Sequence, residues 1–290
     1  MGSLEADTEV VAHDGGLRAT LVEDWRTFGP NGGYLASVAL RAARMATDLA
    51  RPATLSCVFL AVGDFDTVDI EVRSLRRAKR AEALAITLAQ GGRPLLEALV
   101  WAVDDDLPGL DHDIAVAPDV PGPDALKTWD ELAPDDTPAQ FWLNFDRKPV
   151  AWSAPGEPPT GPAVPEVRQW MRFRPVARFD DVWVDACRAV VLLDTFLWPA
   201  ALRGHLQRGP EEAAYIAPSL DLSVRFHREV GPGDWLLVDG VSPVAEAGLM
   251  AGEARVWSEE GRLVASGTGQ LLCREVPRGT AGSGTTAPAS

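Results

Sequence analysis

The sequence predicts an α+β protein made of two similar halves, each with an antiparallel sheet wrapped around one long helix. Each half contains one helical stretch, followed by strand-like stretches rich in Val, Ile and Leu. The halves also match each other. Residues 83–100 and 252–269 both read as a strand, a Gly-Arg turn and a strand, and residues 54–62 match 220–230. A repeat of this length indicates a duplicated domain, because the units of a solenoid are shorter.

In the first half, residues 17–28 are predicted to form a strand and the segment that leaves it. A helix follows the turn at residues 29–33. Four strands are then expected within residues 53–62, 66–77 and 81–103, the last range holding two strands around a Gly-Gly turn. A helix enclosed by a curved sheet must be apolar nearly all round, with small residues where strands approach. Six small residues fit this expectation: Ala36, Ser37, Ala39, Ala42, Ala43 and Ala46.

The second half restarts the pattern. Residues 167–175 read as a strand, and residues 180–198 read as a helix with acidic residues at its start. We expect Pro199 to end this helix, because proline disrupts a helix interior. Four more strands are predicted within residues 219–230, 234–244 and 248–274.

The resulting domains are residues 8–103 and residues 166–275. Between them, residues 104–165 are rich in Asp, Pro and Gly, which is typical of a linker or a long surface excursion. Its aromatic residues predict that part of it packs back on a domain. Residues 276–290 are small, polar and rich in Pro and Gly, and we expect a disordered tail.

The composition excludes several classes of function. A formal net charge of −15 on 290 residues opposes non-specific binding to nucleic acid, and it disfavours binding to a membrane surface. No run of about 18 apolar residues and no apolar leader at the N-terminus is present, so neither a membrane span nor secretion is expected. Three widely spaced cysteines and four scattered histidines predict a reducing cytoplasm, no metal site and no cofactor.

Three motifs, in order, resemble those of a known family. They are GPNGGYLASVALRAA from residue 29, LLDTFLWPAA from residue 192, and IAPSLDLSVRFHR from residue 216 followed by GDWLLV. Together they resemble the acyl-CoA thioesterase II (TesB-like) family of double-hotdog proteins. The resemblance covers residues 8–275, in the same order along the chain.

The resemblance implies a tandem, or double, hotdog. The two antiparallel sheets would join edge to edge into one continuous sheet, with both helices on its concave side. It further implies that thioesters of coenzyme A bind near the junction and that water hydrolyses them without a covalent intermediate. A carboxylate, a hydroxyl and a side-chain amide would activate that water. The substrate could be carried by coenzyme A or by a carrier protein, and further pairing of such sheets would give a homo-oligomer.

Asp221 occupies the position of the family's catalytic aspartate. It lies between Leu220 and Leu222 at the start of a predicted strand, where partial desolvation would strengthen it as a base. The alternative is an aspartate that caps a turn and faces water. The family's hydroxyl position falls on Pro243, with Ser242 beside it, and its amide position falls on Gly269, one residue before Gln270. A bulge at the nearby glycines would bring Gln270 to the right face of the strand.

The turn before the first helix suggests a second part of the site. Gly32 and Gly33 would let the backbone approach a ligand, and the N–H groups at the helix start would hold the oxyanion that develops on a thioester carbonyl. Asn31 and Tyr34 on either side are expected to contact the substrate as well. The alternative is that the glycines only permit a tight turn.

Other readings compete with hydrolysis. If Pro243 and Gly269 mark a decayed triad, the protein binds acyl thioesters without cleaving them. A hydratase with an Asp–His pair is ranked last, because Asp221 and His227 lie six residues apart on one predicted strand. The basic residues between Arg73 and Arg80 would either receive the phosphates of coenzyme A or form a charged strand edge, and the second is favoured.

Overall fold

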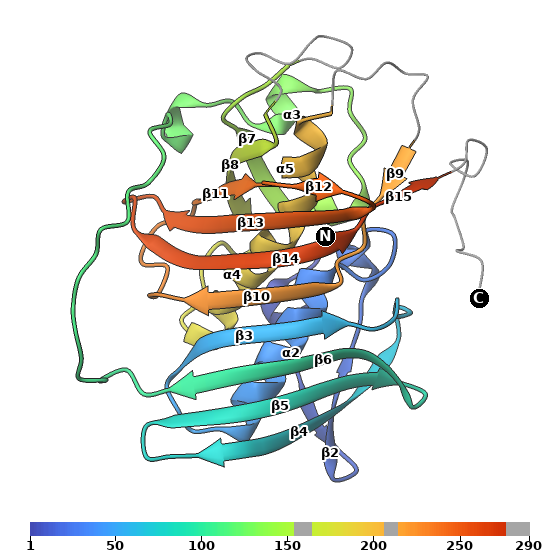
Figure 1. Ribbon diagram of the computed structural model, residues 1–290, viewed down its shortest axis with the longest axis vertical. Coiled ribbons are helices and arrows are strands. Elements are labelled where there is room, and N and C mark those ends of the chain that lie inside the picture. Colours follow the sequence, from blue (N-terminus) through green and yellow to red (C-terminus); the bar gives the residue numbers. More distant parts are fainter. Residues whose placement is uncertain (154–163, 206–213, 277–290) are drawn as a thin grey trace.

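The computed structural model describes residues 1–153, 164–205 and 214–276. Thirteen strands form one antiparallel sheet in the order β1-β2-β4-β5-β6-β3-β10-β14-β13-β11-β8-β7, with β12 paired to β13 (Figure 1). The strands are β1 (Val11–His13), β2 (Gly16–Thr20), β3 (Arg51–Phe59), β4 (Thr67–Arg77), β5 (Ala81–Gln90), β6 (Arg93–Val103), β7 (Phe145–Pro149), β8 (Glu166–Phe173), β10 (Asp221–Phe226), β11 (Leu236–Val241), β12 (Ala245–Glu246), β13 (Leu249–Ser258) and β14 (Leu263–Leu272). A separate pair consists of β9 (Ala214–Ile216) and β15 (Arg274–Val276).

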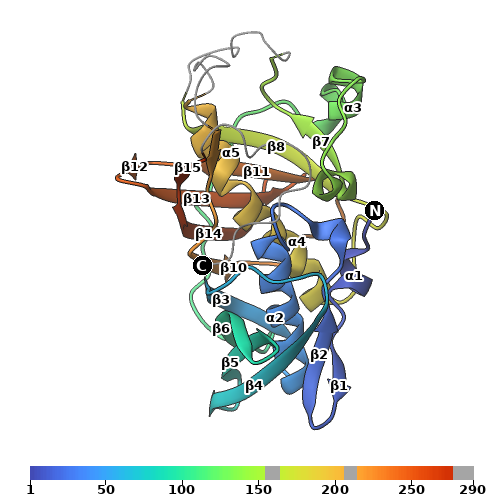
Figure 2. The same cartoon turned by 90° about the vertical axis from the view of Figure 1, so that its right-hand side faces the viewer.

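The helices are α1 (Leu4–Asp7), α2 (Gly32–Ala46), α3 (Trp129–Leu132), α4 (Val182–Thr195) and α5 (Leu197–Arg203), with 3-10 turns at Glu23–Trp25, Pro123–Ala125 and Gln140–Asn144. The two long helices, α2 and α4, lie on the same face of the sheet, which curves around them (Figure 2). Among the residues that the structure describes, no helix is long and apolar enough to cross a bilayer.

The two halves join edge to edge where β3 pairs with β10. Ser56 lies opposite Ser223 at the centre of this pairing, and their hydroxyl oxygens are 3.3 Å apart. The register on either side is reciprocal: Asp221 lies opposite Val58, and Arg225 lies opposite Thr54. Each position of β3 therefore corresponds to the position of β10 that lies 167 residues later, as a pseudo-twofold axis through this pair requires. The expected continuous sheet is confirmed.

The long helices cross on the same pseudo-twofold axis and run antiparallel. The Ser37 hydroxyl lies 3.5 Å from the carbonyl oxygen of Cys187, and the Cys187 thiol lies 3.8 Å from that of Ser37. Helix positions in the two halves therefore correspond at a separation of 150 residues. Because α2 is enclosed by both the sheet and α4, its small residues Ala36, Ala39, Ala42 and Ala43 are fully buried. Five of the six small residues named from the sequence are therefore buried as expected, whereas Ala46, the last residue of α2, is exposed.

The prediction that Pro199 ends the second helix was wrong. Helix α4 ends at Thr195, a second helix, α5, begins at Leu197, and Pro199 lies in the first turn of α5. Proline is tolerated there, because the N–H groups of a first turn have no partner within the helix.

Parts of the segment from residue 104 to residue 165, predicted as a linker or surface excursion, belong to the second half of the fold. Its residues 145–149 form β7, an edge strand paired with β8, so the second half of the sheet begins some twenty residues before residue 166. Ala117, Val120 and Leu126 cover a cluster of tryptophans on the outer face of the second half. Residues 154–163 of this segment, and residues 277–290 of the predicted tail, lie outside the described residues.

Candidate active site

A cavity of about 490 Å³ lies at the junction of the two halves. Its wall is formed by the start of α2 and the end of α4. Phe59, the last residue of β3, and residues 215–220, which precede β10, also belong to it. Most of its wall is apolar and includes Phe28, Leu35, Phe59, Val62, Phe141, Trp142, Trp198, Ile216 and Leu271. Four polar side chains lie close together on this wall, those of Asn31, Asp194, Thr195 and Ser219, and Thr27 and Tyr215 also line the cavity. A few convergent polar groups in an apolar cavity are typical of small-molecule sites.

Asp194 is the central polar residue of this wall, with only 6% of its surface exposed. Its Oδ2 accepts a hydrogen bond of 2.8 Å from the Gly33 N–H, and its Oδ1 accepts one of 2.8 Å from the Ser219 hydroxyl. Burial raises the pKa of Asp194 above its ordinary value, and the hydrogen bonds from Ser219 and Gly33 lower it in part. The sequence analysis missed this residue. Its signal was a single charged residue in the otherwise uncharged and mostly apolar run VVLLDTFLW.

Asn31 connects the two helices beside Asp194. Its Oδ1 caps α2 by accepting a hydrogen bond of 3.0 Å from the Tyr34 N–H, and its Nδ2 lies 3.4 Å from the Thr195 hydroxyl. The cap fixes the side chain, because satisfying an N–H of the first turn holds one rotamer. An amide and a hydroxyl are thus held next to a buried carboxylate.

Asp221 lies beside the cavity rather than in its wall. Its neighbours Ser219 and Leu220 line the cavity. Its Oδ1 accepts a hydrogen bond of 2.7 Å from the backbone N–H of Gln270. Asp221 and Gln270 are therefore in contact, but the contact is made by the backbone N–H of Gln270 and not by its side-chain amide.

Ser242 does not join Asp221. It follows β11, and both β13 and β14 lie between β11 and β10 in the sheet. Ser242 is buried, and its hydroxyl donates a hydrogen bond of 2.8 Å to the carbonyl oxygen of Ala251.

The bulge that would have turned Gln270 to the other face is not present in this part of β14. Gly269 pairs regularly with Gly252, and Gln270 pairs with Ala251. A Cβ at Gly269 would lie 2.7 Å from the Asp221 carbonyl oxygen and 2.8 Å from Cδ1 of Leu197. The amide position that the resemblance implies therefore has no room for a side chain.

Of the four residues predicted to contact the substrate at the start of α2, two line the cavity and two do not. Asn31 and Gly32 line the cavity, whereas Gly33 packs against α4 and Tyr34 is fully buried. The Tyr34 hydroxyl donates a hydrogen bond of 2.7 Å to the Asp7 carbonyl, and its ring stacks on Trp25. Because Asp194 already accepts from the Gly33 N–H, only the Gly32 N–H at this helix start has no partner among the described residues.

The remaining sequence candidates lie elsewhere. None of the basic residues between Arg73 and Arg80 lines the cavity, and Arg77 is paired with Glu82 at 2.6 Å. His227 lies 2.9 Å from the Ser266 hydroxyl, and burial together with Arg228 and Arg225 lowers its pKa. Within the described residues, no group of three or more His, Cys, Asp or Glu could hold a metal ion.

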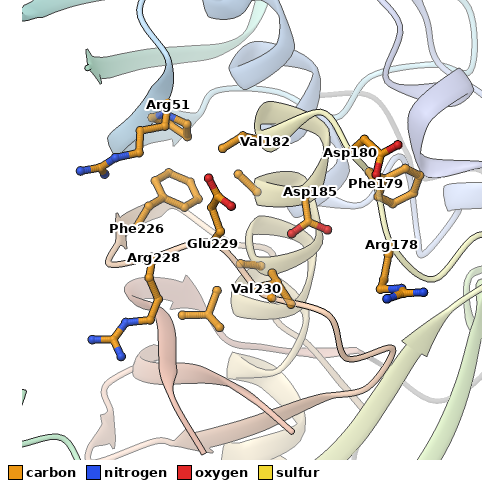
Figure 3. Close-up of a pocket in the computed structure, with 15 residues that line it drawn as sticks. Arg51, Arg178, Phe179, Asp180, Val182, Asp185, Phe226, Arg228, Glu229 and Val230 are labelled. Atoms are coloured by element: carbon orange, nitrogen blue, oxygen red, sulfur yellow. The ribbon is translucent and has the colours of Figure 1, made fainter. Parts of the chain in front are cut away.

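A second cavity, of about 260 Å³, lies at the opposite ends of the same strands and helices (Figure 3). It is the pseudo-twofold counterpart of the first, since Phe226 corresponds to Phe59 and Val182 to Gly32. Charged side chains line it, where the first cavity is apolar: Arg178, Asp185 and Glu229 replace Phe28, Leu35 and Val62.

The arginines of the second cavity are already paired. Arg228 binds Asp113 at 2.8 Å, and Arg178 binds Asp234 at 3.0 Å. Of these two cavities, the first has the more apolar wall.

The comparisons with known proteins agree with this geometry. Residues 21–103 match the acyl-CoA thioesterase N-terminal domain, and residues 119–273 match the acyl-CoA thioesterase C-terminal domain. The structure is similar to that of a conserved protein of unknown function with the hot dog fold from Alicyclobacillus acidocaldarius, with a TM-score of 0.78 and 22% identity over 96% of this chain and 99% of that one.

Two structures from mycobacteria are also similar. They are acyl-CoA thioesterase II TesB2 from Mycobacterium marinum, with a TM-score of 0.75 and 23% identity over 96% of this chain and all of that one, and a tesB protein from Mycobacterium avium subs paratuberculosis, with a TM-score of 0.75 and 21% identity over 93% and 98%. At these identities the likeness shows the fold, a tandem hotdog.

Proposed function

Because this chain belongs to the acyl-CoA thioesterase family, matched over residues 21–103 and 119–273, we propose that it hydrolyses acyl-CoA thioesters to the free acid and coenzyme A. A carboxylate activates the attacking water, and no acyl-enzyme forms. The proposed setting is the cytoplasm. The substrate is an acyl thioester, and acyl groups on a carrier protein are the second form to be tested.

One observation carries this proposal. The junction cavity combines an apolar wall, which suits an acyl chain, with polar groups gathered where α2 begins and α4 ends. The positive end of the α2 dipole points at these groups, which favours negative charge developing on a thioester oxygen. Such preorganised donors act most strongly where water is excluded.

Asp221 is the first candidate for the water-activating carboxylate, since it occupies the position of the family's catalytic aspartate. The Gln270 N–H holds one of its oxygens, and its neighbours form the cavity wall. Ser242 and Gln270 would assist only after a rearrangement of β11 and β14, because the Ser242 hydroxyl is bonded to Ala251 and the Gln270 pairing is regular.

The test is thiol release from a panel of acyl-CoAs, from short to long chains, with the wild type and Asp221→Ala in parallel. Turnover by the wild type is expected on at least one chain length. If Asp221 is the base, the variant should lose about 10²–10⁴ in rate while remaining folded. Absence of turnover on the whole panel, and on acyl carrier protein thioesters, would refute the hydrolase.

A second candidate function, binding without hydrolysis, is favoured by one feature. The position of the family's amide is blocked, because Leu197 and the Asp221 carbonyl fill the space beside Gly269. A protein of this kind would bind acyl-CoA in the junction cavity with no release of thiol. Calorimetry with the same panel separates the two functions, since a binder gives heat of binding and no free coenzyme A.

A further inference from the structure

The hydrogen bonds of Asp194 connect the two parts of the proposed site. Its Oδ2 accepts from the Gly33 N–H at the start of α2, where the oxyanion is expected. Its Oδ1 accepts from the hydroxyl of Ser219, two residues before Asp221. Both contacts are 2.8 Å long, and the carboxylate is almost completely buried. One fixed group therefore spans the space between the helix start and the strand that carries the proposed base.

The sheet holds the segment that leads into β10 from one side. The Leu220 N–H donates a hydrogen bond of 2.7 Å to the Gln270 carbonyl, and the Phe59 N–H donates one of 2.9 Å to the Leu220 carbonyl. Such bonds fix the segment relative to the neighbouring strands. The contact between Ser219 and Asp194 links the same segment to the helices that lie on the sheet.

The duplicated fold forms without this bridge in its other half. Each polar member has a counterpart of another kind, at the 150-residue offset of the helices or the 167-residue offset of the strands: Arg44 for Asp194, Pro52 for Ser219 and Thr54 for Asp221. Pro52 lines the second cavity as Ser219 lines the first. The three groups are thus present together at the junction cavity and absent together at its counterpart, which connects them with the site rather than with the fold.

The equivalent helix start in the second half is satisfied locally. Trp183 corresponds to Gly33, and its N–H donates a hydrogen bond of 2.8 Å to Asp181, the N-cap of the same helix. At α2 the N-cap Asn31 accepts from Tyr34, and the Gly33 N–H is bound by a residue of the other long helix. Since a local cap can satisfy such an N–H, the carboxylate from α4 adds a connection that capping does not require.

Asp194 and Asp221 also act on one buried thiol. Cys57 of β3 lies opposite Leu222 of β10, and its pKa is raised by burial and then by the charges of Asp194 and Asp221. Both carboxylates are therefore near the same side chain, which places the bridge beside the proposed base.

We infer that Asp194 is a positioning residue: by binding Gly33 and Ser219 together, it sets the distance between the oxyanion-binding start of α2 and the carboxylate of Asp221. The inference rests on the hydrolysis proposed above and leaves the activation of water to Asp221. Asp194 acts through the residues that it holds. Because a misplacement of about 1 Å can cost about 10²-fold in rate, loss of the bridge should lower kcat.

The first test compares Asp194→Ala with Asp194→Asn. The alanine variant loses both contacts, so its kcat on the preferred acyl-CoA should fall by about 10²-fold. Its Kd for a thioether analogue of that acyl-CoA, which cannot be hydrolysed, should stay within about threefold, because the apolar wall is intact. Asparagine can accept from the Gly33 N–H through Oδ1 and donate to the Ser219 oxygen through Nδ2. Asp194→Asn should therefore keep kcat within about fivefold of the wild type.

Leu193→Ala is the control for a merely structural effect. Leu193 precedes Asp194 in α4, is fully buried and is not part of the cavity wall. Its truncation should lower the Tm, since it leaves a space in the core. Its kcat, per folded protein, should stay within about threefold of the wild type. A loss of kcat in Asp194→Ala that exceeds the loss in an equally destabilised Leu193→Ala is then not a consequence of stability.

A double-mutant cycle tests whether Asp194 acts through Ser219. Ser219→Ala removes the same hydrogen bond from its other end and should lower kcat by about tenfold. Added to Asp194→Ala, it should cause less than about a twofold further loss, because the contact is already gone. Ser223→Ala is the matched control, since its hydroxyl contacts Ser56 and not Asp194, and it should leave kcat within about twofold.

The outcomes are distinct. If Asp194→Ala keeps more than about a third of the wild-type kcat, if Asp194→Asn is as slow as Asp194→Ala, or if the Ser219 and Asp194 effects multiply, the positioning role fails and hydrolysis stands. If Asp194→Ala does not fold, Ser219→Ala decides, and a wild-type kcat there overturns the inference. If the wild type cleaves no thioester in the panel, the inference and the proposed function both fail.

Discussion

Gly33 of α2 lies directly against Val191 of α4. A Cβ at Gly33 would be 2.7 Å from the Cα of Val191 and 2.9 Å from the carbonyl oxygen of Val190. The neighbouring Gly32 has a different environment, since a Cβ there would be 2.9 Å from an oxygen of Asp194 in the cavity wall. Gly33 therefore permits the close crossing of α2 and α4, whereas Gly32 leaves space beside the Asp194 carboxylate.

Gly33→Ala should therefore destabilise the protein, because the added methyl group meets backbone atoms of α4 that cannot rotate away. We expect a loss of roughly 1–3 kcal/mol in the free energy of unfolding, measured by urea denaturation. Gly109→Ala is the control, since no atom lies within 4 Å of its Cβ position, and it should change stability by less than about 0.5 kcal/mol. Equal stabilities of the two variants would contradict the close helix crossing.

Restoring the family's amide by Gly269→Gln should not increase activity. Its Cβ would lie 2.7 Å from the backbone oxygen of Asp221, which a side-chain movement cannot relieve. We expect a lower Tm and thiol release no faster than in the wild type. Thr268→Gln, on the exposed face of the same strand, should keep the wild-type Tm. A Gly269→Gln protein that is both stable and more active would show that β14 can shift its register.

The size of the cavity should limit the acyl chain. Trp198 lines it from α5, and Trp198→Ala removes a large apolar side chain from its wall. Each methylene newly buried contributes about 0.8 kcal/mol, so KM should fall by about fourfold for each carbon that the enlarged space accepts. Steady-state kinetics over the acyl-CoA panel would reveal the shift toward longer chains. Trp101→Ala, on the exposed surface of β6, should leave the preference unchanged.

The edge strand β7 should make stability depend on pH through Asp146. Burial alone would raise the pKa of Asp146, but hydrogen bonds and charge from Arg174 and Arg172 outweigh it and lower the pKa from 3.8. Since the folded-state pKa is depressed, the stabilisation is present above the unfolded value and is lost as pH falls through the folded one.

Asp146→Asn should therefore be less stable than the wild type at pH 7, by roughly 1–3 kcal/mol. The difference should shrink as pH falls below about 4. Thermal unfolding between pH 2.5 and pH 7 measures it. A difference that does not change with pH would mean that the charge of Asp146 plays no part.

The sequence by itself determined the two repeated halves, the helices that follow their first strands, the apolar faces of the strands and the family resemblance. These features are encoded locally, by the spacing of apolar residues and by turns such as the Gly-Gly turn after β5. It also marked Asn31 and Gly32 as candidates for the site, because a cap and a glycine at a helix start carry their own signal.

Only the tertiary structure decided which polar groups share a cavity. Asp194 meets Gly33 across 161 positions of sequence and Ser219 across 25, because the two helices cross antiparallel and the halves join at β3 and β10. The same packing buried Ser242 against Ala251 and filled the space at Gly269 with Leu197. Periodicity reports which face a residue occupies, whereas the distances between distant segments follow from how the elements pack.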